Sequence, residues 1–323
     1  MKSQIHASSV ISDFAALTKP RISLLCILMF VGGYLYSVVQ VGESLFSARF
    51  FSHLVGSSLL LGMLGTWASV ASANVLNMYW ERKSDKLMER TASRPLPSGR
   101  MKSSTALVFG VVLAVISALS LVRVNETTLL LGLFALGGYV LIYTPLKSIT
   151  PQALLIGAVP GAMPPLMGWT AHSGGIDSVG LVLFGILLLW QVPHFIAIAI
   201  SHKEDYRKAG IQVLPVVSGE KRAVTEALVY SFALLAVSLL LVPLAKAGSA
   251  YAITATVLGL WLIVLCLKGM QSASKIWARK LFLASLVYLP VLTLVLVAES
   301  LLRGLIVAIN VGFVSVGLVF YGV

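Results

Sequence analysis

The chain has 323 residues, of which 58% are hydrophobic and only 11% are charged, and its mean hydropathy is +0.94. Soluble domains carry about a quarter charged residues, so this composition excludes a soluble globular protein and indicates an integral membrane protein. The formal net charge of +12 does not indicate nucleic-acid binding, because basic loops on the cytoplasmic side of a membrane explain such a surplus.

Apolar runs of about 20 residues, separated by short polar loops, predict an all-α fold, a multi-pass bundle of transmembrane helices. In chain order we expect nine spans, at residues 22–41, 53–80, 105–123, 128–146, 151–171, 178–201, 224–245, 249–268 and 280–299. A last apolar run at 304–323 is long enough for a tenth span, although no polar anchor follows it. We therefore expect residues 1–323 to form a single membrane domain with its core at 18–300.

The basic residues predict how the spans are oriented. With the N-terminus placed in the cytoplasm, 20 of the 24 lysines and arginines fall in cytoplasmic segments. The other four are Arg49, Arg123, Lys246 and Arg303. Such a bias indicates a cytoplasmic N-terminus. Two cytoplasmic loops, at 81–104 and 202–223, also carry acidic residues, Gly and Pro, so any chemistry is expected on this side.

The first of these loops follows the end of the second expected span. Asn77, Glu81 and Asp85 are four residues apart, so on a continuous helix they form one row of oxygen ligands about 12 Å long. A hard cation such as Mg²⁺ binds through one or two carboxylates together with substrate phosphates. Basic residues repeat the spacing on a neighbouring row, namely Arg82, Lys86, Arg90 and Arg94. The pattern fits a metal–phosphate site, and equally an ordinary charged loop at a membrane surface.

The second loop repeats this mixture of charges. Glu204 and Asp205 lie at a cytoplasmic helix end, beside Lys203, Arg207 and Lys208. Two such sites facing each other across a bundle could hold a diphosphate between two metal ions. Taken by itself, the second loop is explained equally well as a solvated surface.

Further polar residues lie at the cytoplasmic ends of other spans. Lys19 and Arg21 open the first span, and Tyr143, Thr144 and Lys147 close the fourth. Lysine and arginine at membrane ends are usually anchors whose charged heads reach the lipid headgroups, and this explanation is favoured for them on position alone.

His194 is the only histidine inside an apolar helix. It lies eleven residues before Asp205, which places it about 16 Å deeper along the helix axis. A polar residue within the membrane is a functional candidate by default. A core histidine bonded to a backbone carbonyl is the slightly favoured alternative when this residue is considered alone.

Taken together, these stretches resemble the UbiA superfamily of intramembrane prenyltransferases, and within it the protoheme IX farnesyltransferases, or heme O synthases. The superfamily's first signature, N-x-x-x-D-x-x-x-D, stands here as Asn77, Glu81 and Asp85. The heme O synthase version continues as M-x-R-T-x-x-R-P-L-P, at residues 88–97. The remaining matches are W-Q-x-P-H-F at 190–195, D-Y-x-x-A-G at 205–210, L-P-V-V-x-G at 214–219, T-K-P-R at 18–21 and Y-T-P-L-K at 143–147.

Two residues depart from the superfamily pattern. Glu81 replaces the usual aspartate, which keeps the charge and reaches one methylene further. Ser201 stands where many members have the first aspartate of a D-x-x-x-D pair, so the second metal site is expected to depend on Asp205 with fewer carboxylate partners.

The resemblance implies a reaction between farnesyl diphosphate and heme B. The implied catalytic residues, which would also bind Mg²⁺ as the cofactor, are Asn77, Glu81, Asp85 and Asp205. The implied substrate-binding residues are Lys19, Arg21, Arg90, Arg94, Tyr143, Lys147, His194 and Lys203, with His194 as a heme contact. The 2-vinyl group of the heme would capture the allylic cation, and water would then add to give heme O.

The resemblance also implies a place and partners. It implies the cytoplasmic (inner) membrane of a bacterium, contact with membrane lipid, and a heme A synthase or terminal oxidase assembly as a partner. The nearest alternative is a prenyltransferase acting on an aromatic or quinone precursor, which the metal motif alone does not exclude. A transporter would carry several ionisable residues near the membrane midplane, and an oxidase subunit would lack a polar cluster confined to two loops.

Overall fold

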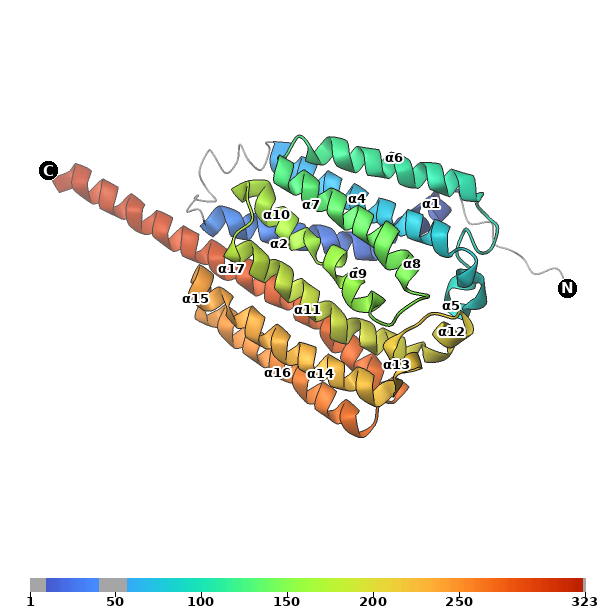
Figure 1. The fold of residues 1–323 in the computed structure, drawn as a ribbon. Coiled ribbons are helices and arrows are strands. Elements are labelled where there is room, and N and C mark those ends of the chain that lie inside the picture. Colours follow the sequence, from blue (N-terminus) through green and yellow to red (C-terminus); the bar gives the residue numbers. More distant parts are fainter. Residues whose placement is uncertain (1–9, 41–56, 322–323) are drawn as a thin grey trace.

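The computed structural model describes residues 10–40 and 57–321, and in these ranges every regular element is a helix (Figure 1). Nine of the described helical segments are long and apolar enough to cross a membrane. The predicted all-α, multi-pass fold is therefore confirmed. The first residues of the predicted second span, 53–56, lie outside the described residues.

Five spans are single helices. They are α2 (Pro20–Gln40), α4 (Ser57–Glu81), α6 (Ser103–Leu121), α11 (Ser178–Ser201) and α16 (Ser249–Gln271). A short helix, α1 (Val10–Thr18), precedes the first of them. The last span begins α17 (Lys275–Tyr321), whose backbone continues as one helix through the predicted tenth span. The side chains of residues 306–323 lie outside the described residues, so a tenth crossing stays a prediction.

The other three spans are interrupted, and each has a proline near its interruption. The fourth consists of α7 (Glu126–Gly137), the π-helix η2 (Gly138–Tyr143) and α8 (Thr144–Leu146), and the wide π turn ends just before Pro145. Proline has no N–H to continue the α-helical hydrogen bonds, which gives a physical reason for the change at this place. The fifth consists of α9 (Ala153–Gly161) and α10 (Met163–Ser173), and the seventh of α14 (Gly219–Leu239) and α15 (Leu241–Ala245).

The spans contact one another in chain order and close into a ring. Each span packs against the next one, and α17 packs back against α2 (Figure 1). Further contacts cross the ring, the most extensive being those of α10 with α2 and of α11 with α17, while α4 also contacts α7 and α10. The core therefore lies between α2, α10, α11 and α17, where Phe30, Met167, Ile196 and Leu289 are buried.

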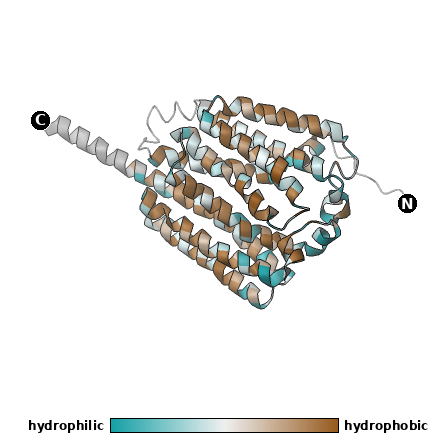
Figure 2. Cartoon of the chain, in the orientation of Figure 1, coloured by the Kyte–Doolittle hydropathy of each residue, from teal (hydrophilic) through white to brown (hydrophobic). Residues whose placement is uncertain are grey.

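The surface is divided between apolar helix faces and one polar end. Large apolar side chains such as Val108, Leu119, Ile253 and Leu294 are exposed on the outer faces, as expected for helices surrounded by lipid. Hydrophilic residues gather at the end of the bundle that carries the loop helices (Figure 2). These short helices are η1 (Ser84–Leu87), α5 (Glu89–Ala92), α12 (Lys203–Lys208) and α13 (Leu214–Val217).

Candidate functional site

Helix α4 ends between the predicted ligands of the first loop. Asn77 and Glu81 lie one turn apart on α4, as the spacing predicts, but the helix stops at Glu81. Arg82 donates a hydrogen bond from Nη1 to the Tyr79 carbonyl at 2.6 Å, and the chain then turns into η1, which carries Asp85. The prediction of one continuous row of three ligands is therefore wrong beyond Glu81. Side-chain bonding to the last helical carbonyls offsets the cost of ending the helix there.

Glu81 is paired with a lysine from the fourth span. Lys147 Nζ lies 2.9 Å from Glu81 Oε1 and 4.8 Å from the centre of the Tyr143 ring. Burial alone would lower the pKa of Lys147, but the nearby Tyr143 and Glu81 outweigh it and hold that pKa well above its usual value. Lys147 is therefore a permanent cation beside the first predicted ligand.

Asp85 is held by the loop that follows it. Arg94 Nη1 lies 2.8 Å from Asp85 Oδ2, and the Asp85 side chain is only 1% exposed. The Thr91 hydroxyl donates to the Asp85 carbonyl at 2.8 Å, which fixes η1 against α5. Further along, Arg100 donates to Asp13 Oδ1 from both Nε and Nη2, at 3.2 and 3.1 Å, and so ties the loop to α1.

Lys19 interacts electrostatically with the charged groups of both ion pairs. It connects α1 to α2 with a left-handed backbone (φ +48°), a conformation that non-glycine residues adopt mainly at turns and functional sites. Burial, followed by the positive charges of Arg94 and Lys147, lowers the pKa of Lys19 to about 7, while Glu81 and Asp85 act in the opposite direction. We call Lys19, Glu81, Asp85, Arg94 and Lys147 the acid–base cluster.

The second loop contacts the first. The backbone N–H of Gln212 donates to the Lys147 carbonyl at 2.9 Å, and Arg90 Nη2 lies 3.5 Å from the Tyr206 hydroxyl. Tyr206 was not among the predicted site residues, although it follows Asp205 directly in the D-Y-x-x-A-G stretch. The loops at 81–104 and 202–223 therefore meet at one end of the bundle.

The charged residues of the second loop have local partners of their own. Asp205 Oδ2 lies 3.8 Å from His202 Nδ1, and Lys203 Nζ lies 2.9 Å from Glu220 Oε1. Burial and then Arg90 lower the pKa of His202, with Asp205 opposing them. Ser201 donates its hydroxyl to the Ala197 carbonyl within α11. Lys203 and Asp205 thus lie in the second loop without an ion pair to the acid–base cluster.

Two other predicted residues are not joined to the cluster. Arg21 is exposed on α2 and has no ion pair within the described residues. His194 lies deep in α11, stacked between the rings of Trp190 (centroid distance 4.6 Å) and Phe282 (4.9 Å). Its Nδ1 lies 2.8 Å from the Ser285 hydroxyl, which itself donates to the Phe282 carbonyl at 2.6 Å. With the one hydroxyl proton donated to Phe282, Nδ1 is the donor in the bond to Ser285, and in this tautomer Nε2 keeps a free lone pair.

The oxygen atoms of the side chains at the end of α4 and in η1 are suitable ligands for a hard cation. In the described part of the chain no three His, Cys, Asp or Glu side chains gather closely enough to hold a metal ion alone. Asn77, Glu81 and Asp85 nevertheless supply only oxygen ligands, and Mg²⁺ needs one or two carboxylates when phosphate oxygens complete its shell. The side chains fit a cation that arrives with a phosphate group better than a resident ion.

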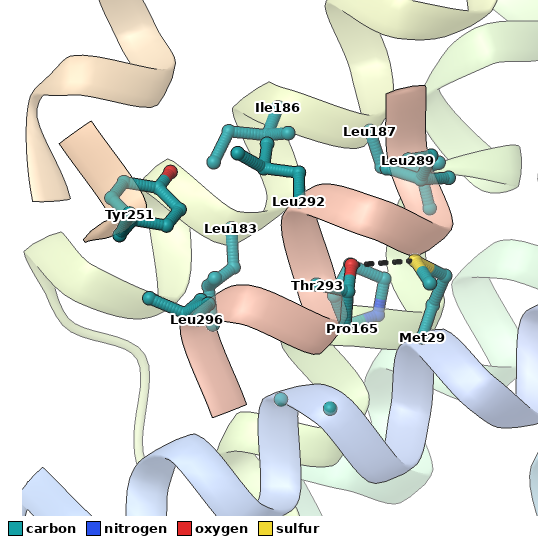
Figure 3. Close-up of a pocket in the computed structure, with 12 residues that line it drawn as sticks. Met29, Pro165, Leu183, Ile186, Leu187, Tyr251, Leu289, Leu292, Thr293 and Leu296 are labelled. Carbon is teal, nitrogen blue, oxygen red and sulfur yellow. Dashed lines mark hydrogen bonds between the residues drawn. The ribbon is translucent and has the colours of Figure 1, made fainter. Parts of the chain in front are cut away.

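A small apolar cavity lies deeper in the bundle, between α2, α10, α11 and α17 (Figure 3). Its volume is about 30 Å³, and Figure 3 shows Met29, Thr293 and Leu292 among the side chains around it. Thr293 Oγ1 lies 3.7 Å from Met29 Sδ across one side. A space of this size holds about one or two water molecules, so it does not accommodate a prenyl chain.

Comparison with known proteins gives a consistent result. A family model described as the UbiA prenyltransferase family matches residues 36–287. The protoheme IX farnesyltransferase of Myxococcus xanthus is 44% identical over 283 residues, which cover 87% of this chain and 92% of that protein. The protein of the same name from Sorangium cellulosum is 46% identical over 238 residues, 73% of this chain and 85% of its own length.

Solved structures show the same fold at lower identity. A digeranylgeranylglyceryl phosphate synthase superposes with a TM-score of 0.71 at 20% identity and covers 90% of this chain and 98% of its own. A UbiA homologue from Archaeoglobus fulgidus bound to GPP and Mg²⁺ gives a TM-score of 0.57 at 17% identity, with the same coverage. At these identities the likeness shows the fold.

Proposed function

The chain belongs to the UbiA prenyltransferase family, and from this membership we propose that it is a protoheme IX farnesyltransferase. It transfers the farnesyl group of farnesyl diphosphate to the 2-vinyl group of heme B, with addition of water, and gives heme O and diphosphate. The observation that carries the proposal is the 44% identity to the Myxococcus xanthus protoheme IX farnesyltransferase over 87% of this chain. The acid–base cluster supports it, because it offers both cations and carboxylates to a diphosphate.

The carboxylates and the amide of the first loop are the proposed site of Mg²⁺. Asn77, Glu81 and Asp85 would hold the ion together with diphosphate oxygens, and Asp205 would contribute from the second loop. When bound, Mg²⁺ stabilises the negative charge that develops on the departing diphosphate. The Archaeoglobus fulgidus homologue holds GPP and Mg²⁺ on the same fold, which supports this assignment.

The ion pairs of the cluster suggest how the chain receives the diphosphate. Lys147 and Arg94 neutralise Glu81 and Asp85 at 2.9 and 2.8 Å. If Glu81 and Asp85 bound a metal ion, Lys147 and Arg94 would be free to bind the phosphate oxygens, which arginine can do in a bidentate way. Lys19, with its pKa near 7, adds a third cation once the anion binds and favours its charged form. In this exchange the carboxylates would pair with the metal ion and the basic side chains with the diphosphate, so that no buried charged group would be left without a partner.

The reaction then requires a cation to survive until the heme captures it. The bond between the farnesyl C1 and the diphosphate oxygen breaks, and its electron pair leaves with the diphosphate. The vinyl carbon supplies the electrons for the new carbon–carbon bond, and water adds to the resulting cation and loses a proton. The rings of Tyr139 and Tyr143 lie 4.9 Å apart and are tilted by 54°, and Lys147 lies over the Tyr143 ring, so this pair places aromatic rings that can stabilise an allylic cation beside the acid–base cluster. The apolar bundle keeps water from the cation before transfer.

His194 is the proposed heme contact. Because Nδ1 donates to Ser285, Nε2 is the nitrogen with a lone pair for the heme iron or for a polar group of the heme. The stacked Trp190 and Phe282 hold the His194 ring in one orientation.

We place the protein in the bacterial cytoplasmic membrane with the acid–base cluster on the cytoplasmic side, since the distribution of basic residues favours that topology. A heme A synthase or terminal oxidase assembly as partner stays a prediction.

One reaction tests the proposal. Purified protein is incubated with heme B, Mg²⁺ and farnesyl diphosphate, and the porphyrin is identified by mass. A gain equal to farnesyl plus water is expected, and a reaction in which EDTA replaces Mg²⁺ serves as the inactive control. Parallel incubations replace heme B by 4-hydroxybenzoate, since a family member acting on an aromatic acceptor is the alternative. Product from the aromatic acceptor, with the heme unchanged, would overturn the assignment.

A further inference from the structure

We infer that Thr144 is a positioning residue that orients the Asn77 amide, so that Asn77 Oδ1 is directed to the metal–diphosphate site. The inference rests on the proposed function, in which Asn77 is a ligand. It assigns a role to a residue of the fourth span that touches neither of the two ion pairs of the cluster. The orientation of the amide depends on which atom receives the Thr144 hydroxyl proton.

The Thr144 hydroxyl makes two hydrogen bonds. Its oxygen lies 2.9 Å from the Tyr139 carbonyl and 3.1 Å from Asn77 Nδ2. A carbonyl can only accept, so in the 2.9 Å bond the single hydroxyl proton points to Tyr139. The hydroxyl can then only accept from Asn77, which requires the NH₂ group of the amide on that side. The orientation of the amide therefore follows from the chemistry of Thr144, and not from the similar shapes of its nitrogen and oxygen.

The π-helix makes the Tyr139 carbonyl available to Thr144. The backbone N–H of Thr144 also bonds to this carbonyl, five residues earlier, which is the π-helical pattern. Both polar groups of Thr144 are thus bound to one oxygen, and its side chain cannot rotate without losing a bond. An extra residue in the turn shifts the face of the following residues by about 100° relative to an α-helix. Thr144 and Lys147 reach α4 from this shifted face.

Burial strengthens the effect of the hydrogen bond between Asn77 and Thr144 on the orientation of the amide. Asn77 is 1% exposed and Thr144 is 3% exposed, so bulk water does not compete for either group. Reversal of the amide would place two oxygens against each other and leave buried groups without partners. Within the described residues no donor reaches Asn77 Oδ1, which lies one helical turn before Glu81. This oxygen is the atom that the arrangement leaves for a cation.

The test is binding of Mn²⁺, used as a spectroscopic substitute for Mg²⁺. Paramagnetic resonance measures free Mn²⁺ in the presence of a farnesyl thiodiphosphate that the enzyme does not cleave. Thr144→Val keeps the shape and removes both hydroxyl bonds, and it is expected to weaken Mn²⁺ binding roughly 10-fold or more, as loss of an orienting partner does at metal sites. Thr144→Ser keeps the hydroxyl and is expected to stay within about threefold of the wild type.

A matched control separates positioning from packing. Thr128 is also a fully buried threonine of the fourth span, bonded to Thr170 at 2.9 Å, and it does not contact the cluster. Thr128→Val should leave Mn²⁺ binding unchanged. The inference is overturned if Thr144→Val binds Mn²⁺ as tightly as the wild type, if Thr144→Ser is as weak as Thr144→Val, or if the wild type binds no Mn²⁺. Failure of the proposed acceptor is distinct, because it changes the porphyrin product and not this binding.

Discussion

The contact between α2 and α10 leaves no room for a side chain at two glycines. A Cβ atom added at Gly168 would lie 1.9 Å from the Phe30 carbonyl oxygen, and one at Gly33 would lie 2.1 Å from the Pro165 carbonyl oxygen. Both obstacles are backbone atoms, which cannot move without moving the helix. Gly168→Ala should therefore force the two helices apart.

The required shift follows from ordinary contact distances. Carbon and carbonyl oxygen come no closer than about 3.3 Å, so α10 must move by about 1.4 Å at this point. A gap of about 1 Å already forfeits a quarter to a half of the attraction between packed atoms, and Phe30, Tyr34, Leu166 and Met167 share this interface. Because packing drives helix association in lipid, we expect Gly168→Ala to cost about 3 kcal/mol, the upper end of the range for overpacked sites.

Unfolding in mixed micelles of a mild detergent and SDS, followed by circular dichroism, measures this cost. Gly137→Ala is the control, because Gly137 is also helical but a Cβ there meets nothing within 4 Å. Alanine at that position should be neutral or stabilise the protein by about 0.5–1 kcal/mol. Equal unfolding midpoints for Gly168→Ala and the wild type would refute the reasoning, as would an equal loss in both variants.

The remaining predictions concern the site. Removal of divalent cations with EDTA should abolish farnesyl transfer and added Mg²⁺ should restore it; full activity in EDTA would contradict a role for the metal. Asp85→Asn should raise the Mg²⁺ concentration that gives half of the maximal rate roughly tenfold or more, which corresponds to about 1.4 kcal/mol of binding free energy. Burial and the neighbouring Arg94 and Lys147 lower the pKa of Lys19 to about 7, so its ammonium is lost as the pH rises through this value. The equilibrium affinity of the protein for farnesyl diphosphate should therefore fall between about pH 6 and about pH 8, and Lys19→Arg, which keeps its charge, should remove this part of the pH dependence. His194→Ala should abolish the shift of the heme absorption band on binding, whereas His172→Ala on α10 should not; normal binding and farnesylation by His194→Ala would exclude His194 as the heme contact.

Local sequence patterns predicted part of the backbone geometry correctly. Asn77 and Glu81 share a face because four residues make about one turn of α4, and this depends on the helix alone. The same reasoning failed at Asp85, because bonds from the next loop end the helix at Glu81. Spacing along the chain carries no information about where a helix stops when the stop depends on such bonds.

Pairings between distant residues could not be predicted from spacing. Lys147 was a candidate from its place at a membrane end, but its partner Glu81 lies 66 positions earlier in the chain. The contact of Arg90 with Tyr206 and that of Asp13 with Arg100 likewise join separate segments. Each of these pairs forms only when helices that are remote in sequence pack side by side.

The sequence by itself determined that the chain crosses a membrane as a bundle of apolar helices and carries most of its lysines and arginines at one end, because hydrophobic length and the distribution of lysine and arginine are local properties. Only the tertiary structure decided how those charges are used. It paired the carboxylates of the first loop with Lys147 and Arg94, brought the second loop against Lys147, and turned Thr144 toward Asn77 through a π-helix. The physical reason is that a buried polar group must find a partner, and the packing of the helices determines which partner lies within reach.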